Sequence, residues 1–140
     1  MELYQFIKSR EGKSNKVYPD SVGKPTVGIG HLVTKSDNLV IGDTISDDKI
    51  KEFFELDIRK AKGKAEKQCS ELGISDPDLL IIFVSANFQL GDFKAVFPET
   101  FELIKNKKYA QAILNLATSK WMKQTPVRAG DMISAITKLV

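Results

Sequence analysis

The longest regular feature of the sequence is an amphipathic pattern that covers residues 50–72. Its apolar members recur at steps of three and four, the spacing of one helical face: Ile50, Phe53, Phe54, Ile58, Ala61, Ala65, Cys69 and Leu72. Ser46 precedes the pattern as a candidate N-cap, and Asp47 and Asp48 would occupy a first turn that favours acidic side chains. The pattern predicts one long helix in the middle of the chain.

Helical patterns continue after this helix. Asp76 and Pro77 predict the start of an apolar, buried helix that ends at Gly91, with proline at its first position. Shorter helices are predicted around residues 100–106, 109–117 and 126–139. The second part of the chain is therefore expected to be helical throughout.

The first part of the chain is of a different kind. Leu3, Phe6, Ile7 and Glu11 are spaced as one helical face, and Gly12 is a plausible stop. Residues 17–33 then predict two or three short strands with turns at 19–21 and 22–24. Together these patterns predict an α+β fold with a small N-terminal β lobe and a larger helical lobe.

Composition limits the classes of protein to which the chain can belong. The chain has 140 residues, which suits a single domain, and a formal net charge of +3. One cysteine, Cys69, allows no intramolecular disulfide and favours a reducing compartment, and we expect its thiol to be inert in the core. The start of the sequence has no signal-peptide pattern, and the longest apolar run, Leu79 to Val84, is too short to span a membrane.

The stretch from Ser9 to Lys35 contains two acids in different settings. Glu11 extends the apolar stripe at the end of the first helix, where the helix dipole and partial burial both favour the protonated acid. A protonated carboxylic acid can serve as a general acid, although a glutamate at a helix end can also simply pair with a lysine or arginine. Asp20 lies in the turn-rich "YPDSVGK", where aspartate is common for local hydrogen-bonding reasons.

A glycine-rich strand is expected beside these acids, beginning at Thr26. Alternation predicts one face with little bulk, which leaves room either for a ligand or for a tight packing contact with another element: Thr26, Gly28, Gly30 and Leu32. The other face would carry Val27, Ile29, His31 and Val33. His31 is the only histidine, so we expect a hydrogen-bonded structural role for it and no zinc site. No nucleotide-binding glycine motif is complete, and we expect no cofactor and no metal.

Two acids of different environment beside a groove are typical of glycoside hydrolysis, which pairs a protonated donor with an ionised partner. The spacing "E-G-x5-Y-x-D-x5-T-x-G-x-G-H-L" from Glu11 to Leu32 resembles the signature of phage-type lysozymes, the endolysins of glycoside hydrolase family 24. The likeness recurs at "NFQLG" and at "NLATSKWMKQTPVRAGDMI", in the family's order.

The resemblance implies a lysozyme-like fold, with residues 12–46 as the β lobe, 47–70 as the connecting helix, and 71–140 plus 1–11 as the helical lobe. It also implies peptidoglycan as substrate, cut between N-acetylmuramic acid and N-acetylglucosamine with inversion. By residue-to-residue match, the implied catalytic residues are Glu11, Asp20 and Thr26, and the implied sugar contacts are Leu32, Phe88, Thr100 and Asn115. Arg128 matches an arginine that pairs with the general acid, and His31 and Gln89 are expected to support the site.

Three alternatives remain open at this stage. A lytic transglycosylase would cut the same bond with one glutamate and leave a 1,6-anhydro product. A wall-binding or structural module would keep the fold without turnover. Nucleic-acid binding is disfavoured, because the lysine-rich stretches "RKAKGKAEK" and "KNKK" are interrupted and read as solvated faces. We expect a monomer made in the cytoplasm that reaches the periplasm or cell wall through a holin-type pore or a delivery protein.

Overall fold

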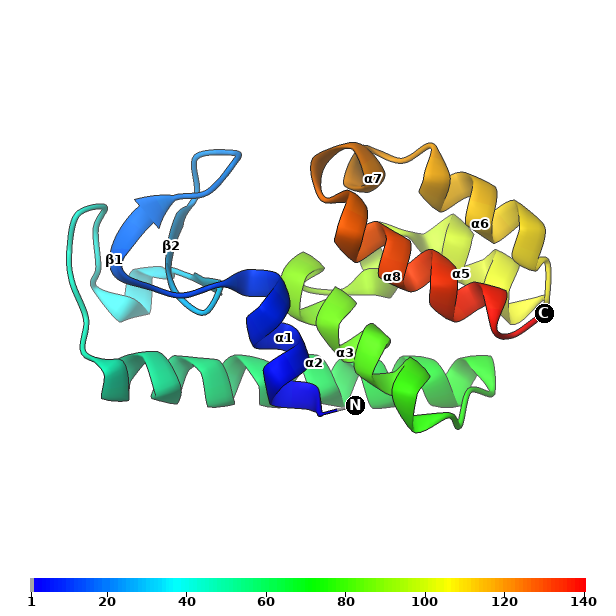
Figure 1. Cartoon of the computed structure of the whole chain (residues 1–140), viewed down its shortest axis with the longest axis horizontal. Coiled ribbons are helices and arrows are strands. Elements are labelled where there is room, and N and C mark those ends of the chain that lie inside the picture. Colours follow the sequence, from blue (N-terminus) through cyan, green and yellow to red (C-terminus); the bar gives the residue numbers. More distant parts are fainter. Residues whose placement is uncertain (1) are drawn as a thin grey trace. The chain divides into compact units, whose positions relative to one another are not determined.

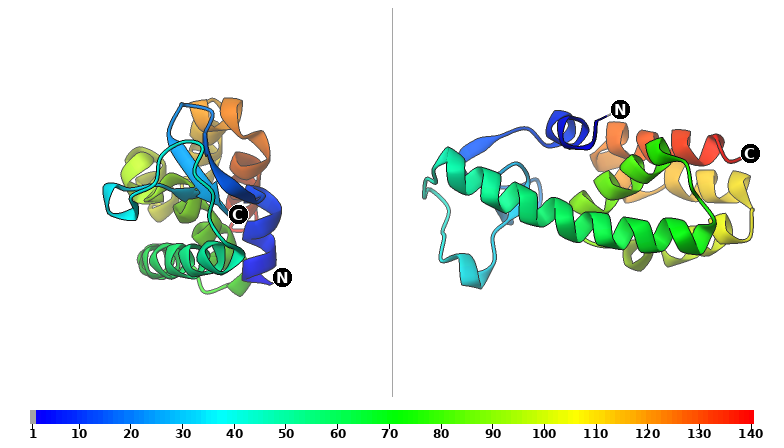
Figure 2. Two further views of the ribbon diagram at one scale, coloured as in Figure 1. Left: turned by 90° about the vertical axis from the view of Figure 1, so that its left-hand side faces the viewer. Right: turned by 90° about the horizontal axis from the view of Figure 1, so that it is seen from below.

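The computed structural model describes residues 2–140, which form two compact units, Glu2–Lys60 and Ala61–Val140. The boundary between them falls inside the long helix α2, Asp47–Leu72, which runs without a break (Figures 1 and 2). The first unit contains the only sheet in the described part of the chain, and the second is helical. The α+β prediction is therefore confirmed.

The first unit begins with α1, Leu3–Glu11. The Glu2 carboxylate caps it by accepting hydrogen bonds from the backbone N–H groups of Tyr4 and Gln5 at 3.0 and 2.9 Å. Gly12 ends it with φ +74°, a conformation that favours glycine. The predicted helix and its stop are thus correct, and α1 belongs to the same compact unit as the sheet.

The sheet is antiparallel and has three strands in the order β1-β2-β3: Ser14–Pro19, Pro25–Gly28 and His31–Leu32 (Figure 1). Tyr18 pairs with Thr26, and Thr26 pairs with Leu32. The single alternating strand expected from Thr26 onward is wrong. The chain turns at Ile29 and Gly30, because Gly28 and Gly30 adopt φ values of +66° and +68° and close a hairpin between β2 and β3.

One face of this sheet is packed and dry. Val17, Val27 and Phe53 form a hydrophobic cluster, against which Val33, Leu39 and Ile45 pack. The short 3₁₀-helix η1, Lys35–Asp37, follows the sheet and leads into a loop that returns to β1 through a bridge between Lys16 and Thr44. Lys49 N–H donates to the Ser46 hydroxyl at 3.1 Å, which confirms the predicted N-cap of α2.

The second unit is built around α3, Pro77–Leu90, whose N-cap Asp76, first proline and terminal Gly91 are as predicted. It also contains α4 (Phe93–Val96), α5 (Pro98–Lys105), α6 (Tyr109–Ala117), α7 (Lys120–Gln124) and α8 (Pro126–Thr137). Helix α8 packs against α3, α6 and α7. The short helices α4 and α7 were not predicted. No helix within residues 2–140 is both long and apolar enough to cross a bilayer.

A buried polar network joins α2 to the end of α3 in this unit. The Asn87 side chain exchanges two hydrogen bonds with Gln68, at 2.8 and 3.2 Å, and also bonds the Phe83 carbonyl and the Phe93 N–H. Gln68 donates further to Asp92, which caps α4. Because Asn87 is 2% exposed and all of its polar valences are used, the network fixes the turn that leads from α3 to α4.

Candidate active site

The Glu11 carboxyl group lies over Gly30, in the turn between β2 and β3. A β-carbon at residue 30 would lie 2.5 Å from Glu11 Oε1 and 2.8 Å from its Cδ. Such distances are not tolerated between non-bonded atoms, so the missing side chain is what makes room for the acid. Gly28 serves a different contact, since a β-carbon there would meet Ile50 on α2 at 3.3 Å.

These contacts show what lies beside the two glycines. The Glu11 carboxyl occupies the space beside Gly30, and the Ile50 side chain occupies the space beside Gly28. Thr26 itself is 7% exposed, and its hydroxyl donates to the Lys24 carbonyl at 3.1 Å. Of the two roles that the sequence left open for these glycines, close packing against another element is the one observed.

Asp20 is held by the turn in which it lies. Its Oδ1 accepts hydrogen bonds from the backbone N–H groups of Val22 and Lys24, at 2.9 and 2.8 Å. The backbone closes the same turn through bonds from Asp20 N–H to the Lys24 carbonyl and from Gly23 N–H to the Asp20 carbonyl. One carboxylate oxygen is therefore committed to the turn, while Oδ2 bonds to none of residues 2–140.

Tyr18 lies close to both acids and was missed as a site residue by the sequence analysis. Partial burial raises the pKa of its phenol, and the negative charges of Glu11 and then Asp20 raise it further. The motif does contain this tyrosine, two positions before Asp20, but a tyrosine in a strand gives no signal of its own. The structure thus brings Glu11, Tyr18, Asp20 and Thr26 together within the first unit.

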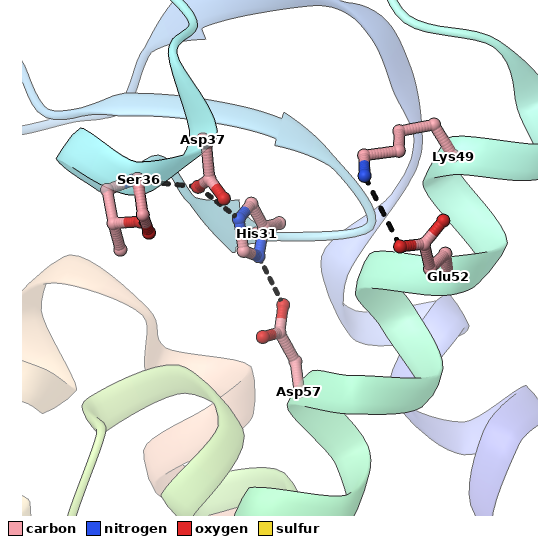
Figure 3. A network of polar contacts seen from close by, with 7 residues as sticks. His31, Ser36, Asp37, Lys49, Glu52 and Asp57 are labelled. Carbon is pink, nitrogen blue, oxygen red and sulfur yellow. Dashed lines mark hydrogen bonds and ion pairs between the residues drawn. The ribbon is translucent and has the colours of Figure 1, made fainter.

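His31 is hydrogen-bonded, as predicted, and it has two carboxylate partners. Its Nδ1 lies 2.6 Å from Asp57 Oδ2 on α2, and its Nε2 lies 2.9 Å from Asp37 Oδ2 at the end of η1 (Figure 3). The ring also stacks on Phe53, with centroids 3.9 Å apart and planes 4° from parallel. This trio ties the β2–β3 hairpin to α2, directly after the glycine that seats Glu11.

The electrostatics of the trio favour the charged histidine. Burial lowers the pKa of His31, but the hydrogen bonds that its ring makes to the Asp57 and Asp37 carboxylates, together with their charges, outweigh burial, so the pKa is raised. For Asp37, burial acts to raise the pKa, while hydrogen bonds from the Thr34 backbone and from His31 lower it below its usual value. An imidazolium between two carboxylates satisfies both ring N–H groups.

The supporting residues Arg128 and Gln89 lie in the second unit. Arg128, 7% exposed, donates from one terminal nitrogen to the carbonyl and hydroxyl of Ser85 on α3, at 2.9 and 3.0 Å. Gln89 donates to the Thr125 hydroxyl at 3.1 Å and accepts from the Trp121 indole at 2.9 Å. Both side chains therefore fix the ends of α7 and α8 against α3.

The expected sugar contacts differ in their exposure. Leu32 is 49% exposed, and Phe88 and Asn115 are half-buried at the surface. Thr100 is 2% exposed within α5, so its side chain is not available to a glycan, and this assignment is corrected. Burial also raises the pKa of the Cys69 thiol to about 12, in keeping with the inert cysteine that was predicted.

Comparison with known proteins gives consistent matches over nearly the whole chain. A family model described as phage lysozyme matches residues 8–138. A protein of Dictyostelium discoideum named "Probable T4-type lysozyme 2" is 30% identical over 155 residues, which cover 94% of this chain and 91% of that protein. The "Peptidoglycan hydrolase gp36" of Pseudomonas phage phiKMV is 30% identical over 133 residues, which cover 94% of this chain but only 14% of the phage protein.

Proposed function

Because the chain belongs to the phage lysozyme family, we propose that it is a peptidoglycan hydrolase that cleaves the β-1,4 bond between N-acetylmuramic acid and N-acetylglucosamine. The observation that supports the proposal is that the charges of two carboxyl groups, those of Glu11 and Asp20, both act on Tyr18, the strand partner of Thr26. Glycosidases of the two-carboxylate type use such a pair, one acid to protonate the leaving oxygen and one base to assist water.

Glu11 is the proposed general acid. Its carboxyl group is confined over Gly30 at the end of α1, so its position is set by the backbone of two elements, α1 and the β2–β3 turn. Confinement of the acid favours catalysis, because the proton must be delivered to one oxygen of a bound substrate and a small displacement of the acid lowers the rate of proton transfer. His31 stabilises the same turn through Asp57 and Asp37.

Asp20 and Thr26 are the proposed holders of the attacking water. Thr26 spends its only hydroxyl proton on the Lys24 carbonyl, so its oxygen can serve only as an acceptor for a water proton. Asp20 keeps Oδ2 free of bonds to residues 2–140, and this oxygen can accept the second proton. A water held by two acceptors directs its lone pair away from them, which suits attack on the anomeric carbon with inversion.

The test is digestion of purified peptidoglycan by the full chain. Borohydride reduction of the fragments followed by mass analysis identifies which sugar carries the new reducing end, and N-acetylmuramic acid is expected. Proton NMR during the reaction should show the α-anomer appearing first. A reducing end on N-acetylglucosamine would refute the proposed bond, and a 1,6-anhydro product would identify a transglycosylase.

We further expect the site of action to be the bacterial cell wall, with the chain acting as a monomer. Entry through a holin-type pore or on a delivery protein stays a prediction. Sedimentation of the purified chain tests the expected monomeric state, since a stable dimer would contradict it.

A further inference from the structure

Three side chains form a row across the sheet on the face opposite the hydrophobic cluster. Tyr18 of β1 is the direct partner of Thr26 of β2, and Thr26 is the direct partner of Leu32 of β3. Directly paired residues of antiparallel strands project from the same face, with neighbouring strands ~4.8 Å apart. The row therefore spans ~10 Å, with Thr26 in the middle.

The exposure of this row is unusual for a small antiparallel sheet. The solvated face of such a sheet normally carries polar side chains. Here Tyr18 is 37% exposed and Leu32 is 49% exposed, while Thr26 between them is 7% exposed. Two large, partly exposed side chains thus flank a buried threonine in the row.

A bulge in β1 puts Tyr18 at this position. Ser14 pairs with Gly28, but four residues later Tyr18 pairs with Thr26, so β1 carries two extra residues relative to β2. The extra segment bonds elsewhere, with Val17 N–H donating to the Asp43 carbonyl at 2.8 Å and Gly42 N–H donating to the Val17 carbonyl at 2.9 Å. Bulges of this kind redirect side chains beside functional sites.

The phenol of Tyr18 is suited to donate a hydrogen bond to a ligand. Burial and the charges of Glu11 and Asp20 raise its pKa, so the hydroxyl group keeps its proton. That hydroxyl makes no hydrogen bond with any residue of 2–140, although two acids lie nearby. A half-buried donor that the protein leaves unused can bind a sugar hydroxyl or acetamido oxygen.

We propose that Tyr18 is a glycan-binding residue, which packs its ring against the sugar on one side of the scissile bond while Leu32 packs against the sugar on the other side. In this arrangement the β-1,4-linked glycan runs across the three strands, and its anomeric carbon comes to lie above Thr26. The ring supplies an apolar surface for a sugar face, and the hydroxyl donates to one sugar oxygen. The inference rests on the proposed function, since it assigns a role in the same site.

The test uses Tyr18→Ala and Tyr18→Phe, with Tyr4→Ala and Tyr4→Phe as matched controls. Tyr4 is similarly exposed, at 44%, and lies on α1, where its ring packs edge-on against Phe54. The ligand is the tetrasaccharide with alternating N-acetylglucosamine and N-acetylmuramic acid, titrated calorimetrically against a Glu11→Gln background that prevents turnover. Tyr18→Ala should weaken binding about tenfold, or ~1.4 kcal/mol, with a smaller loss for Tyr18→Phe and no change for the Tyr4 variants.

Kinetics and spectroscopy separate this role from a structural one. On soluble uncrosslinked glycan chains, Tyr18→Phe should raise KM more than it lowers kcat, because it removes a binding group and leaves the acids in place. In ¹³C NMR titrations, Glu11→Gln should lower the pKa of Tyr18, which checks the proximity of Tyr18 and Glu11 in solution. If the wild type cleaves peptidoglycan while Tyr18→Ala binds and turns over as the wild type does, the inference is wrong and the proposed function stands. Failure of the wild type to bind or cleave glycan would refute both.

Discussion

The carboxyl group of Glu11 occupies the place where any other residue at position 30 would put its β-carbon, 2.5 Å from Oε1. Gly30 also has φ +68°, so glycine is required there for two separate reasons. The acid and the glycine come from different elements, α1 and the β2–β3 turn, and the fit between them sets the position of the proposed proton donor.

Gly30→Ala should therefore abolish most of the activity while the protein still folds. A displacement of the acid by about 1 Å is expected to cost on the order of 100-fold in turnover. Glu11→Gln gives the background activity of the assay, because an amide cannot donate the proton. The control is Gly73→Ala, at φ +72° with nothing within 4 Å of an added β-carbon. Both alanine variants should lose ~1–2 kcal/mol of stability from backbone strain. Equal activity of the two would show that Gly30 does not position the acid.

Asp20 should respond differently to loss of charge and loss of its side chain. Asn keeps an Oδ1 acceptor for the Val22 and Lys24 N–H groups, so Asp20→Asn should leave the unfolding free energy nearly unchanged while turnover falls sharply. Asp20→Ala also removes both bonds and should cost ~1–3 kcal/mol of stability. Urea unfolding and fragment release measure the two effects. An active Asp20→Asn would exclude the carboxylate as the base.

Thr26 should be needed for its oxygen and not for its methyl group. Thr26→Ser keeps the acceptor and should retain activity within about tenfold, whereas Thr26→Val should lose ~10²-fold or more. Valine also removes the bond to the Lys24 carbonyl, with an expected loss of ~1 kcal/mol. Initial rates of fragment release on peptidoglycan, with melting curves as the fold check, distinguish these cases. Equal rates in the two variants would assign Thr26 to packing alone.

The contribution of His31 to stability should depend on pH in a defined window. Its folded pKa is raised above the usual 6.5, so its stabilisation is full below about pH 6.5 and is lost as pH rises through the folded pKa. The folded pKa of Asp37 is lowered below the usual 3.8, so its stabilisation is present above that value and is lost as pH falls through the folded pKa. Both contributions are full between about pH 4 and 6.5.

Melting temperatures of the wild type and His31→Gln, measured from pH 3 to pH 9, test this window. The difference should be largest near pH 5 and should shrink toward pH 9. Near pH 5, removal of the partner through Asp57→Asn is expected to cost ~1.5–3 kcal/mol, the range for a hydrogen bond to a charged group. A difference between wild type and His31→Gln that stays constant from pH 5 to pH 9 would contradict the charged trio.

The network of Asn87 and Gln68 should behave as a coupled pair. Asn87→Leu leaves the Gln68 amide and the Phe93 N–H without their buried partner, at an expected cost on the order of 3 kcal/mol. Gln68→Leu should lower the unfolding free energy much less in the Asn87→Leu background than in the wild type, because both polar partners are then removed. Asn106→Ala, at an exposed position, is the control. Additive losses in the double variant would show that the pair is not coupled.

The features predicted well from the sequence are those that neighbouring residues decide. Ser46 and Asp76 cap their helices with their own side chains, and Gly12 and Gly91 end helices through local backbone geometry, so the bounds of α1, α2 and α3 could be predicted. Helices α4 and α7 contain four and five residues, too few to show a helical period.

The features that were missed depend on residues far apart in the chain. The partners of His31 lie 6 and 26 positions away, and no pattern in the sequence connects them. The alternation of apolar and small residues continues through Gly28 and Gly30, so the two-residue period gave no sign of the turn between β2 and β3. The purpose of Gly30 appears only when α1 brings Glu11 to it, a contact across 19 positions.

The turn that holds Asp20 is closed by hydrogen bonds between its own residues. Every bond that orients the carboxylate comes from residues 20–24, with Asp20 Oδ1, its N–H and its carbonyl all satisfied inside those five residues. The loop meets the strands at the antiparallel pairing of Pro19 with Pro25 and at the bond from the Thr26 hydroxyl to the Lys24 carbonyl. The five residues thus orient the carboxylate through their own hydrogen bonds. A protein engineer could transplant them onto another antiparallel hairpin and keep the orientation of the carboxylate.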